Sequence, residues 1–230
     1  MLAVLLAAVV GLDDAKEIRL AGLGVWKKTG EWKEAAAIGL DPSNEKKLLA
    51  VSYSEPPKII FNGTNGKSID VVSKEEFGDC ELHVEFMVPK GSNSGVYLMG
   101  RYEIQVFDSW GVEKPEHSDC GGIYQRWKDN MGYEGRPPKV NASKKPGEWQ
   151  SFDITFKAPR FDSDGKKIEN AKFVKVVHNG KVVHENESLS GPTRAAHFED
   201  EKPTGPLMLQ GDHGPVAFRN IVVKRMKDEG

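Results

Sequence analysis

The sequence has little net charge, only two cysteines and no long segment with helical periodicity. Its 32 Lys and Arg residues nearly balance 34 Asp and Glu residues, which leaves a formal net charge of −2. This balance gives no electrostatic footprint for a nucleic acid or an anionic membrane, so we expect an uncharged partner. The 230 residues are 38% hydrophobic, which is enough to bury one substantial core.

Long hydrophobic runs are also scarce. Leu2–Val10 is unbroken and apolar, but it is far too short to span a bilayer. Such a run is typical of the hydrophobic part of a signal peptide, although no Lys or Arg precedes it here. We therefore expect residues 1–12 to be a signal peptide or its remnant, residues 13–230 to form a single domain, and the protein to be exported to the periplasm or beyond. A cytoplasmic location is the alternative.

The two cysteines are Cys80 and Cys120. An exported protein could keep them as a disulfide, because an oxidising compartment preserves paired cysteines. Cys80, however, falls in the apolar phase of an alternating segment, where a small hydrophobic side chain is expected. Two buried thiols are the favoured interpretation, and the disulfide is the alternative.

Alternation of apolar and polar residues dominates the rest of the chain. It is clear along Cys80–Val88 and again along Trp149–Phe156, and both segments are predicted to be strands with one buried face. Asn179-Gly180 lies between two further apolar segments and suits the positive φ angles of a type I′ hairpin turn. Many short strands and no helices predict two stacked antiparallel sheets of the jelly-roll type. The other predicted strands are Lys47–Val51, Lys58–Phe61, Val96–Met99, Tyr102–Asp108, Phe173–Val177, Lys181–His184, Leu207–Leu209 and Val216–Lys224.

One long stretch, Gly111–Gly147, interrupts this pattern. It is rich in Gly, Pro and aromatic residues, and its only predicted strand is Gly122–Trp127. Loops of this length in compact domains are usually functional or disordered, and the aromatic residues argue against disorder. We expect a functional loop.

The strand YEIQVFD, residues 102–108, carries the first candidate site. Glu103 and Gln105 share one face about 7 Å apart, and Arg101 falls in the same phase. An acid, an amide and a guanidinium in a row can hold sugar hydroxyls through several directional hydrogen bonds. The alternative is a set of ordinary polar residues on a solvated sheet face.

The segment GYEIQVFDS is similar to the E-I-D-x-x-E strand of the laminarinase and lichenase group of retaining β-glucanases. In this chain Gln105 replaces the middle aspartate, and Asp108 stands where the acid/base glutamate would be. Retaining glycosidases need two carboxyl groups about 5–5.5 Å apart, which Glu103 and Asp108 are not expected to reach. Double-displacement chemistry is therefore disfavoured.

A broader resemblance covers nearly the whole chain. It rests on the blocks FGDCELHVEF, NSGVYLMGRYEIQVFDS, CGGIYQRW, NASKKPGEWQSFDITFKAPRFD, AKFVKVVHNGKVVHEN, GPTRAA and GPLMLQGDHGPVAFRNI. Together these resemble the 3-keto-disaccharide hydrolase domain family. The resemblance implies a concanavalin A-like jelly-roll sandwich, export, and 3-keto sugars as the substrate class.

A ketone at C3 acidifies the hydrogen on C2 and lets the substituent on C1 leave by elimination. Such chemistry needs a base for C2, a donor to the leaving oxygen and a positive group facing the enolate oxygen. We predict Glu103 as the base, His213 on the QGDHG turn as the group that donates or accepts protons, and Arg101 as the enolate stabiliser. A turn histidine that caps strands is the alternative for His213. The predicted substrate-binding residues are Gln105, Asp108, Tyr124, Gln125, Trp127 and Gln210.

The predicted function is hydrolase-type or lyase-type cleavage of 3-keto glycosides or disaccharides. A non-catalytic carbohydrate-binding module of the same fold is the alternative, because it would use the same groove without proton transfer. No cofactor is required by the sequence, although Glu103, Asp108 and His213 have side chains that suit a divalent ion. The sugar, its linkage and the oligomeric state are left open.

Overall fold

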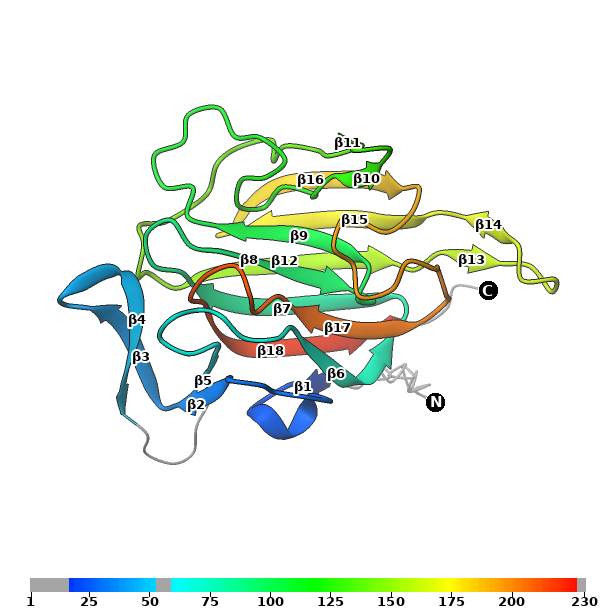
Figure 1. Ribbon diagram of the computed structural model, residues 1–230. Helices are drawn as coiled ribbons and strands as arrows, with labels where there is room; N and C mark the ends of the chain where they lie inside the picture. Colours follow the sequence, from blue (N-terminus) through cyan, green and yellow to red (C-terminus); the bar gives the residue numbers. More distant parts are fainter. Residues whose placement is uncertain (1–16, 53–58, 227–230) are drawn as a thin grey trace, which may run out of the picture.

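Two antiparallel β-sheets stacked face to face form the body of the molecule (Figure 1). The computed structural model describes residues 17–52 and 59–226. Within those residues the only helical element is a 3₁₀ helix, η1 (Leu23–Val25), and no helix has the length and apolar character needed to cross a membrane. The predicted all-β fold of two stacked antiparallel sheets is confirmed. Residues 1–12, on which the signal-peptide prediction rests, lie outside the described residues, and export stays a prediction.

The larger sheet is built around the strongly alternating segments. Val84 lies opposite Phe152 in its centre, and both side chains are fully buried. The strand order is β16-β15-β12-β7-β18-β5-β2, and β1 also pairs with β18. The strands are β1 (Glu17–Arg19), β2 (Lys33–Ala35), β5 (Ile59–Phe61), β7 (Cys80–Met87), β12 (Gln150–Lys157), β15 (Ala171–His178), β16 (Lys181–Leu189) and β18 (Ala217–Arg225).

The smaller sheet has the order β6-β17-β8-β9 and positions the candidate site. Its strands are β6 (Val71–Phe77), β8 (Asn93–Leu98), β9 (Tyr102–Phe107) and β17 (Gly205–Leu209). The register places Val72, Met208, Tyr97 and Glu103 in one row across the sheet. Because successive residues of a strand point to opposite faces, this row lies on the face opposite to the core.

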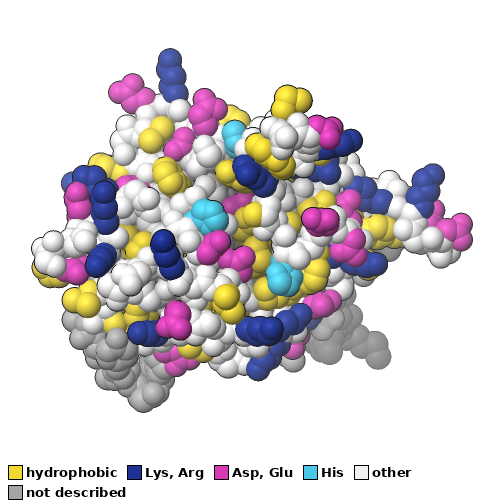
Figure 2. All heavy atoms as spheres, viewed as in Figure 1, with side chains coloured by type: hydrophobic (Ala, Val, Ile, Leu, Met, Phe, Trp, Pro, Cys, Tyr) yellow, Lys and Arg dark blue, Asp and Glu magenta, His cyan; other side chains and the backbone are white. Residues whose placement is uncertain are grey.

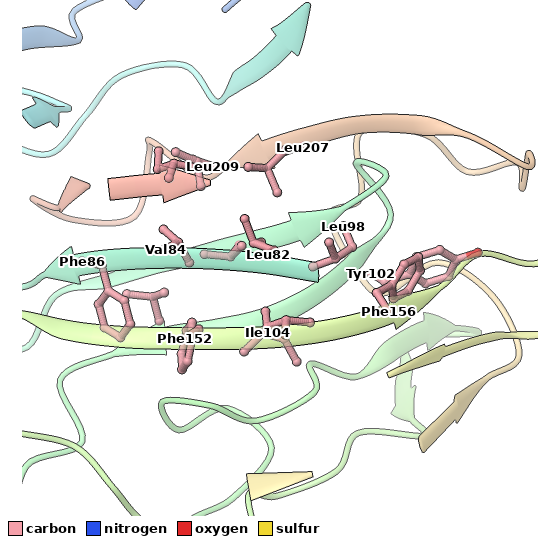
Figure 3. Packing of buried hydrophobic residues seen from close by; sticks show 14 of the residues in the cluster. Leu82, Val84, Phe86, Leu98, Tyr102, Ile104, Phe152, Phe156, Leu207 and Leu209 are labelled. Atoms are coloured by element: carbon pink, nitrogen blue, oxygen red, sulfur yellow. The ribbon is translucent and has the colours of Figure 1, made fainter. Parts of the chain in front are cut away.

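The core lies between the two sheets (Figure 3). Phe86 and Phe152 from the larger sheet are in aromatic contact, with ring centroids 4.7 Å apart. Leu98 and Ile104 from the smaller sheet pack against the same cluster. Each fully buried side chain of this size contributes about 1.5–3 kcal/mol relative to an exposed one, so this layer dominates the stability of the sandwich.

Asn179 and Gly180 connect β15 to β16 with φ angles of 49° and 78°. Positive φ at both central positions is the signature of a type I′ turn, and the predicted hairpin is confirmed. Three small two-stranded sheets complete the fold. Their strands are β3 (Ala37–Asp41) with β4 (Asn44–Ser52), β10 (Arg126–Lys128) with β11 (Met131–Tyr133), and β13 (Arg160–Phe161) with β14 (Lys167–Glu169).

The long loop is ordered along the edge of the smaller sheet. The prediction of a continuous strand over Gly122–Trp127 is wrong. In the structure β10 begins only at Arg126, and Ile123 forms isolated bridges to Ile104 and Arg136. The backbone nevertheless pairs with β9: Gly121 N–H donates to Gln105 O at 2.8 Å and Tyr124 N–H donates to Glu103 O at 3.2 Å. The loop therefore covers the edge of β9.

The two cysteines are separate and buried. Burial raises the pKa of the Cys80 thiol to about 12, and that of Cys120 also to about 12. The favoured interpretation of two buried thiols is confirmed, and the alternative disulfide is not formed.

Candidate functional site

A cavity of about 280 Å³ lies over the outer face of the smaller sheet, beside β8 and β9. Figure 2 views the molecule from this side and shows histidine and acidic side chains near the middle of the face. Five of the nine residues predicted from the sequence line the cavity: Glu103, Gln105, Tyr124, Gln210 and His213. Four more residues line it that were not predicted: Asn93, Tyr97, Arg194 and Ala195.

Glu103 is the acid of this cavity. It projects from β9 on the outer face, yet only 2% of its surface is exposed. Burial raises the pKa of Glu103 to about 8, hydrogen bonding with the Tyr97 hydroxyl opposes the rise, and the negative charge of Asp70 adds to it. At neutral pH the carboxyl group is therefore largely protonated and can still lose its proton within the physiological range.

The space for this carboxyl group comes from Gly95, which lies directly opposite Gln105 on β8. A Cβ atom at position 95 would overlap Oε1 of Glu103 and lie 2.7 Å from the Tyr97 ring. Oε2 of Glu103 has no hydrogen-bond partner among the described residues. Buried polar atoms normally have one, so this oxygen lacks the hydrogen-bond partner that its burial calls for.

Amide side chains form the next part of the wall. Gln105 Nε2 donates to Asn93 Oδ1 at 3.2 Å and to the carbonyl of Ser118 at 3.2 Å. Gln210 follows β17, and its N–H donates to Gly95 O at 3.0 Å. These amides offer both donors and acceptors, which is the set of partners that sugar hydroxyls need.

His213 reaches the cavity on the turn that follows Gln210. The buried side chain of Asn62 holds this turn: its Nδ2 donates to Gly211 O at 2.9 Å and to Gly214 O at 2.7 Å. A Cβ on Gly211 would overlap the Ile69 carbonyl, so this close approach requires glycine. His213 Nδ1 is hydrogen-bonded to the Asp212 carboxylate, and the histidine side chain is 51% exposed.

Tyr124 is carried to the cavity by the edge loop, and its ring lies 5.7 Å from the ring of His117. Asn141 fixes the base of the loop, because its Nδ2 donates to Ser109 O at 2.7 Å and to Val112 O at 2.9 Å. The ordered loop thus supplies one wall of the cavity, as expected for a functional loop.

Two of the predicted residues face other parts of the molecule. Arg101 is 3% exposed and its guanidinium is bound by Asp200, by the Met99 carbonyl at 2.9 Å and by the face of Phe198. It does not line the cavity, so its expected position facing an enolate is corrected. Asp108 accepts from the Gly91 N–H at 2.9 Å and belongs to the turn after β9.

Gln125 and Trp127 lie beside the cavity. The side chain of Gln125 packs against Gly132 in the β10–β11 hairpin, where a Cβ would overlap it. Trp127 lines a second cavity of about 430 Å³, which shares Arg194 and Ala195 with the first. Neither Gln125 nor Trp127 is among the residues that line the Glu103 cavity.

The unpredicted residues differ in how visible they are in the sequence. Tyr97 alternates with the buried Val96 and Leu98, so its position on the outer face could have been found from the period of two. Arg194 and Ala195 come from an irregular segment, where no periodicity indicates which side chains face the sheet. Asn93 begins β8 and reaches the cavity through its contact with Gln105.

Among residues 17–52 and 59–226, no three His, Cys, Asp or Glu side chains come together in a way that could hold a metal ion. Glu103 and His213 line the same cavity, whereas Asp108 is bound in its turn. The described donor set therefore does not fit the divalent ion that Glu103, Asp108 and His213 were considered for.

Comparison with known proteins places this chain in a family. A family model described as the 3-keto-alpha-glucoside-1,2-lyase-like domain matches residues 20–224. The chain belongs to this family. The matched range includes every residue that lines the Glu103 cavity. No curated protein matches the chain.

Solved structures agree with membership in the 3-keto-alpha-glucoside-1,2-lyase-like family. A crystal structure of a proposed glycosyl hydrolase from Parabacteroides distasonis ATCC 8503 is 26% identical, covers 90% of this chain and 86% of its own, and superposes with a TM-score of 0.60. A second proposed glycosyl hydrolase from the same organism is 22% identical, with a TM-score of 0.52, and covers 85% of this chain and 99% of its own. The second shares the fold. Together with the family, the first makes this chain a carbohydrate-active protein.

Proposed function

We propose that the protein cleaves glycosides whose sugar carries a ketone at C3, by elimination across C1 and C2. The observation that carries the proposal is the Glu103 carboxyl group, which is buried in a sugar-sized cavity, has a pKa of about 8 and keeps one oxygen without a partner. The family match supports the substrate class.

The reaction follows from the chemistry of the ketone. A base removes the C2 hydrogen as a proton, and the electron pair left behind forms the enolate of the C3 carbonyl. The enolate then returns its electrons to form the C1=C2 double bond, while the C1–O bond breaks and the leaving oxygen takes a proton. Addition of water to the resulting enone converts the same product into the free keto sugar, so lyase and hydrolase outcomes share the first step.

Glu103 is suited to remove the C2 proton. A general base works best when its pKa lies near the operating pH, because both protonation states are then populated. An ordinary glutamate with a pKa of 4.5 would be ionised but too weak a base, whereas burial raises the pKa of Glu103 to about 8. His213, hydrogen-bonded to Asp212 at the same cavity, can supply a proton to the leaving oxygen.

A two-carboxylate glycosidase mechanism does not fit this cavity. Among the described residues that line it, Glu103 is the only carboxylic acid. Retaining and inverting glycosidases both place a second carboxyl group across the scissile bond. Elimination needs one base, which matches the residues present.

The test compares wild type with Glu103→Gln on a 3-keto glucoside, with product release followed by mass spectrometry. We expect turnover by wild type and a loss of at least about 100-fold in kcat for Glu103→Gln. Glu113→Gln is the matched control, because Glu113 is exposed and lies outside the cavity. Saturable binding of the keto sugar without turnover by wild type would instead make the protein a carbohydrate-binding module.

A further inference from the structure

Arg194 carries a positive charge that no carboxylate of the described protein neutralises. Its guanidinium forms neither a hydrogen bond nor a salt bridge within residues 17–52 and 59–226, although Glu199 lines the neighbouring cavity with it. Its one partner is the face of Trp127, whose ring centroid lies 3.9 Å from the Arg194 Cζ atom. Arg194 is exposed, so water hydrates the rest of its guanidinium, and a ligand that enters the cavity can replace this water.

Backbone hydrogen bonds to the edge loop and to the start of β9 hold Arg194 at the cavity. The Arg194 N–H donates to Gln125 O at 2.8 Å. The hydroxyl of the preceding Thr193 donates to the carbonyl of Arg101 at 3.0 Å, just before β9, and accepts from the Glu103 N–H at 3.2 Å within β9. One hydroxyl therefore links the strand position of the Glu103 base to the position of the Arg194 cation.

The next residue, Ala195, has a φ of 60°. This left-handed conformation is unfavourable for a residue with a Cβ, and such strain is concentrated at functional sites. Ala195 itself lines the cavity, so the strained turn is part of the wall. The Ala196 N–H donates to the carbonyl of Thr193 at 3.3 Å, which closes the turn around Arg194, and the Trp127 ring packs against the end of the Arg194 side chain.

The side chains that line the cavity offer a developing anion one unpaired positive charge, although the negative charge of Asp70 acts on Glu103 from outside this lining. Tyr97, Tyr124 and three amide side chains are neutral, and Glu103 is largely protonated below pH 8. The imidazole Nδ1 of His213 is already hydrogen-bonded to the Asp212 carboxylate, so that nitrogen is not available to an anionic ligand. Arg101, which directly precedes β9, is bound by Asp200. Among the described residues, Arg194 is thus the unneutralised cation at this cavity.

We propose that Arg194 stabilises the enolate oxygen formed when Glu103 removes the C2 proton, and that Trp127 is the positioning residue that holds its guanidinium in place. This inference rests on the proposed function, because it names the group that meets the negative charge of that reaction. Guanidinium groups suit this task, since they remain charged and present several donors in a fixed plane.

The test isolates the enolate step from bond cleavage. The probe is a 3-keto sugar with hydrogen in place of the C1 oxygen substituent, which can lose its C2 proton but has no group to eliminate. In D₂O, wild type is expected to exchange the C2 hydrogen for deuterium, as followed by NMR. Arg194→Gln should slow this exchange, and kcat on the 3-keto glucoside, by about 100-fold or more, with a much smaller change in KM.

Two variants of Trp127, a chemical rescue and a control variant separate positioning from folding. Trp127→Ala should lower kcat by roughly 10-fold, and Trp127→Phe should retain most of it, because a phenyl face still supports the cation. Added guanidinium ion, below concentrations that unfold the protein, should restore part of the exchange in Arg194→Ala. Trp110→Ala is the matched control. Trp110 is exposed, its ring centroid lies 5.7 Å from the Lys145 Nζ atom, and it lines neither cavity, so its removal should leave exchange unchanged.

The outcomes distinguish the two ideas. Exchange without cleavage by wild type would refute the proposed cleavage while supporting the enolate step, and loss of that exchange in Arg194→Gln would still support Arg194. Equal exchange and equal kcat in wild type and Arg194→Gln would overturn the assignment of Arg194 alone. If the wild type shows neither exchange nor cleavage, both the proposed cleavage and the assignment of Arg194 are overturned.

Discussion

Replacing Glu103 with glutamine should stabilise the protein, and the gain should grow with pH. The pKa of Glu103 is about 8 in the folded protein, against an ordinary value of 4.5. Between these two pH values the folded state keeps a proton that the unfolded chain has released, so this group makes the folded state progressively less stable as the pH rises. Each pH unit corresponds to about 1.4 kcal/mol, which places the cost at about 3 kcal/mol at pH 7 and about 5 kcal/mol above pH 8.

Glutamine has nearly the same shape and no charge, so it removes this pH-dependent cost. Urea unfolding of wild type and Glu103→Gln at pH 5, 7 and 9 measures the difference in free energy of unfolding directly. We expect a small difference at pH 5 and a gain of a few kcal/mol for the variant at pH 9, with Glu113→Gln following wild type throughout. A difference that does not change with pH, or that falls as the pH rises, would refute a raised pKa at Glu103.

Two other predictions concern the cavity and a third concerns the thiols of the core. Gly95→Ala places a Cβ where the Glu103 carboxylate lies, and the resulting displacement should lower kcat by about 100-fold in steady-state assays; unchanged kcat would contradict the packing. Tyr97→Phe removes the hydrogen bond that lowers the pKa of Glu103, so the pH profile of kcat/KM should move to higher pH, and a move to lower pH would disprove the interaction. Cys80 and Cys120, both buried with a pKa of about 12, should react with a thiol reagent only after unfolding in urea; finding no thiol in the unfolded chain would reveal a disulfide.

The core strands could be predicted because their burial pattern is written directly in the sequence. The alternation that ends at Val88 matches β7, and the alternation around Phe152 matches β12, where each apolar residue enters the space between the sheets. The Asn179-Gly180 turn could be predicted because few residue pairs adopt positive φ at two successive positions.

The sequence predicted the residues of the candidate site only where the alternation along a strand determines which side chains share a face. Glu103 and Gln105 lie on the outer face of β9, as their spacing indicates. Arg101 shares their phase, but it precedes β9, and Asp200 binds its guanidinium away from the cavity. Arg194 reaches the cavity through hydrogen bonds between a turn and the edge of β9, and these depend on segments that are far apart in the chain.

The most direct test of the account is a comparison of one glucoside with its C3-oxidised counterpart as substrates of the wild-type protein. Elimination requires the acidic C2 hydrogen that only the ketone provides, so we predict cleavage of the 3-keto glucoside and none of the unoxidised glucoside under the same conditions. Cleavage of both at similar rates would contradict the mechanism, because it would mean that the protein breaks the glycosidic bond without removing the C2 proton.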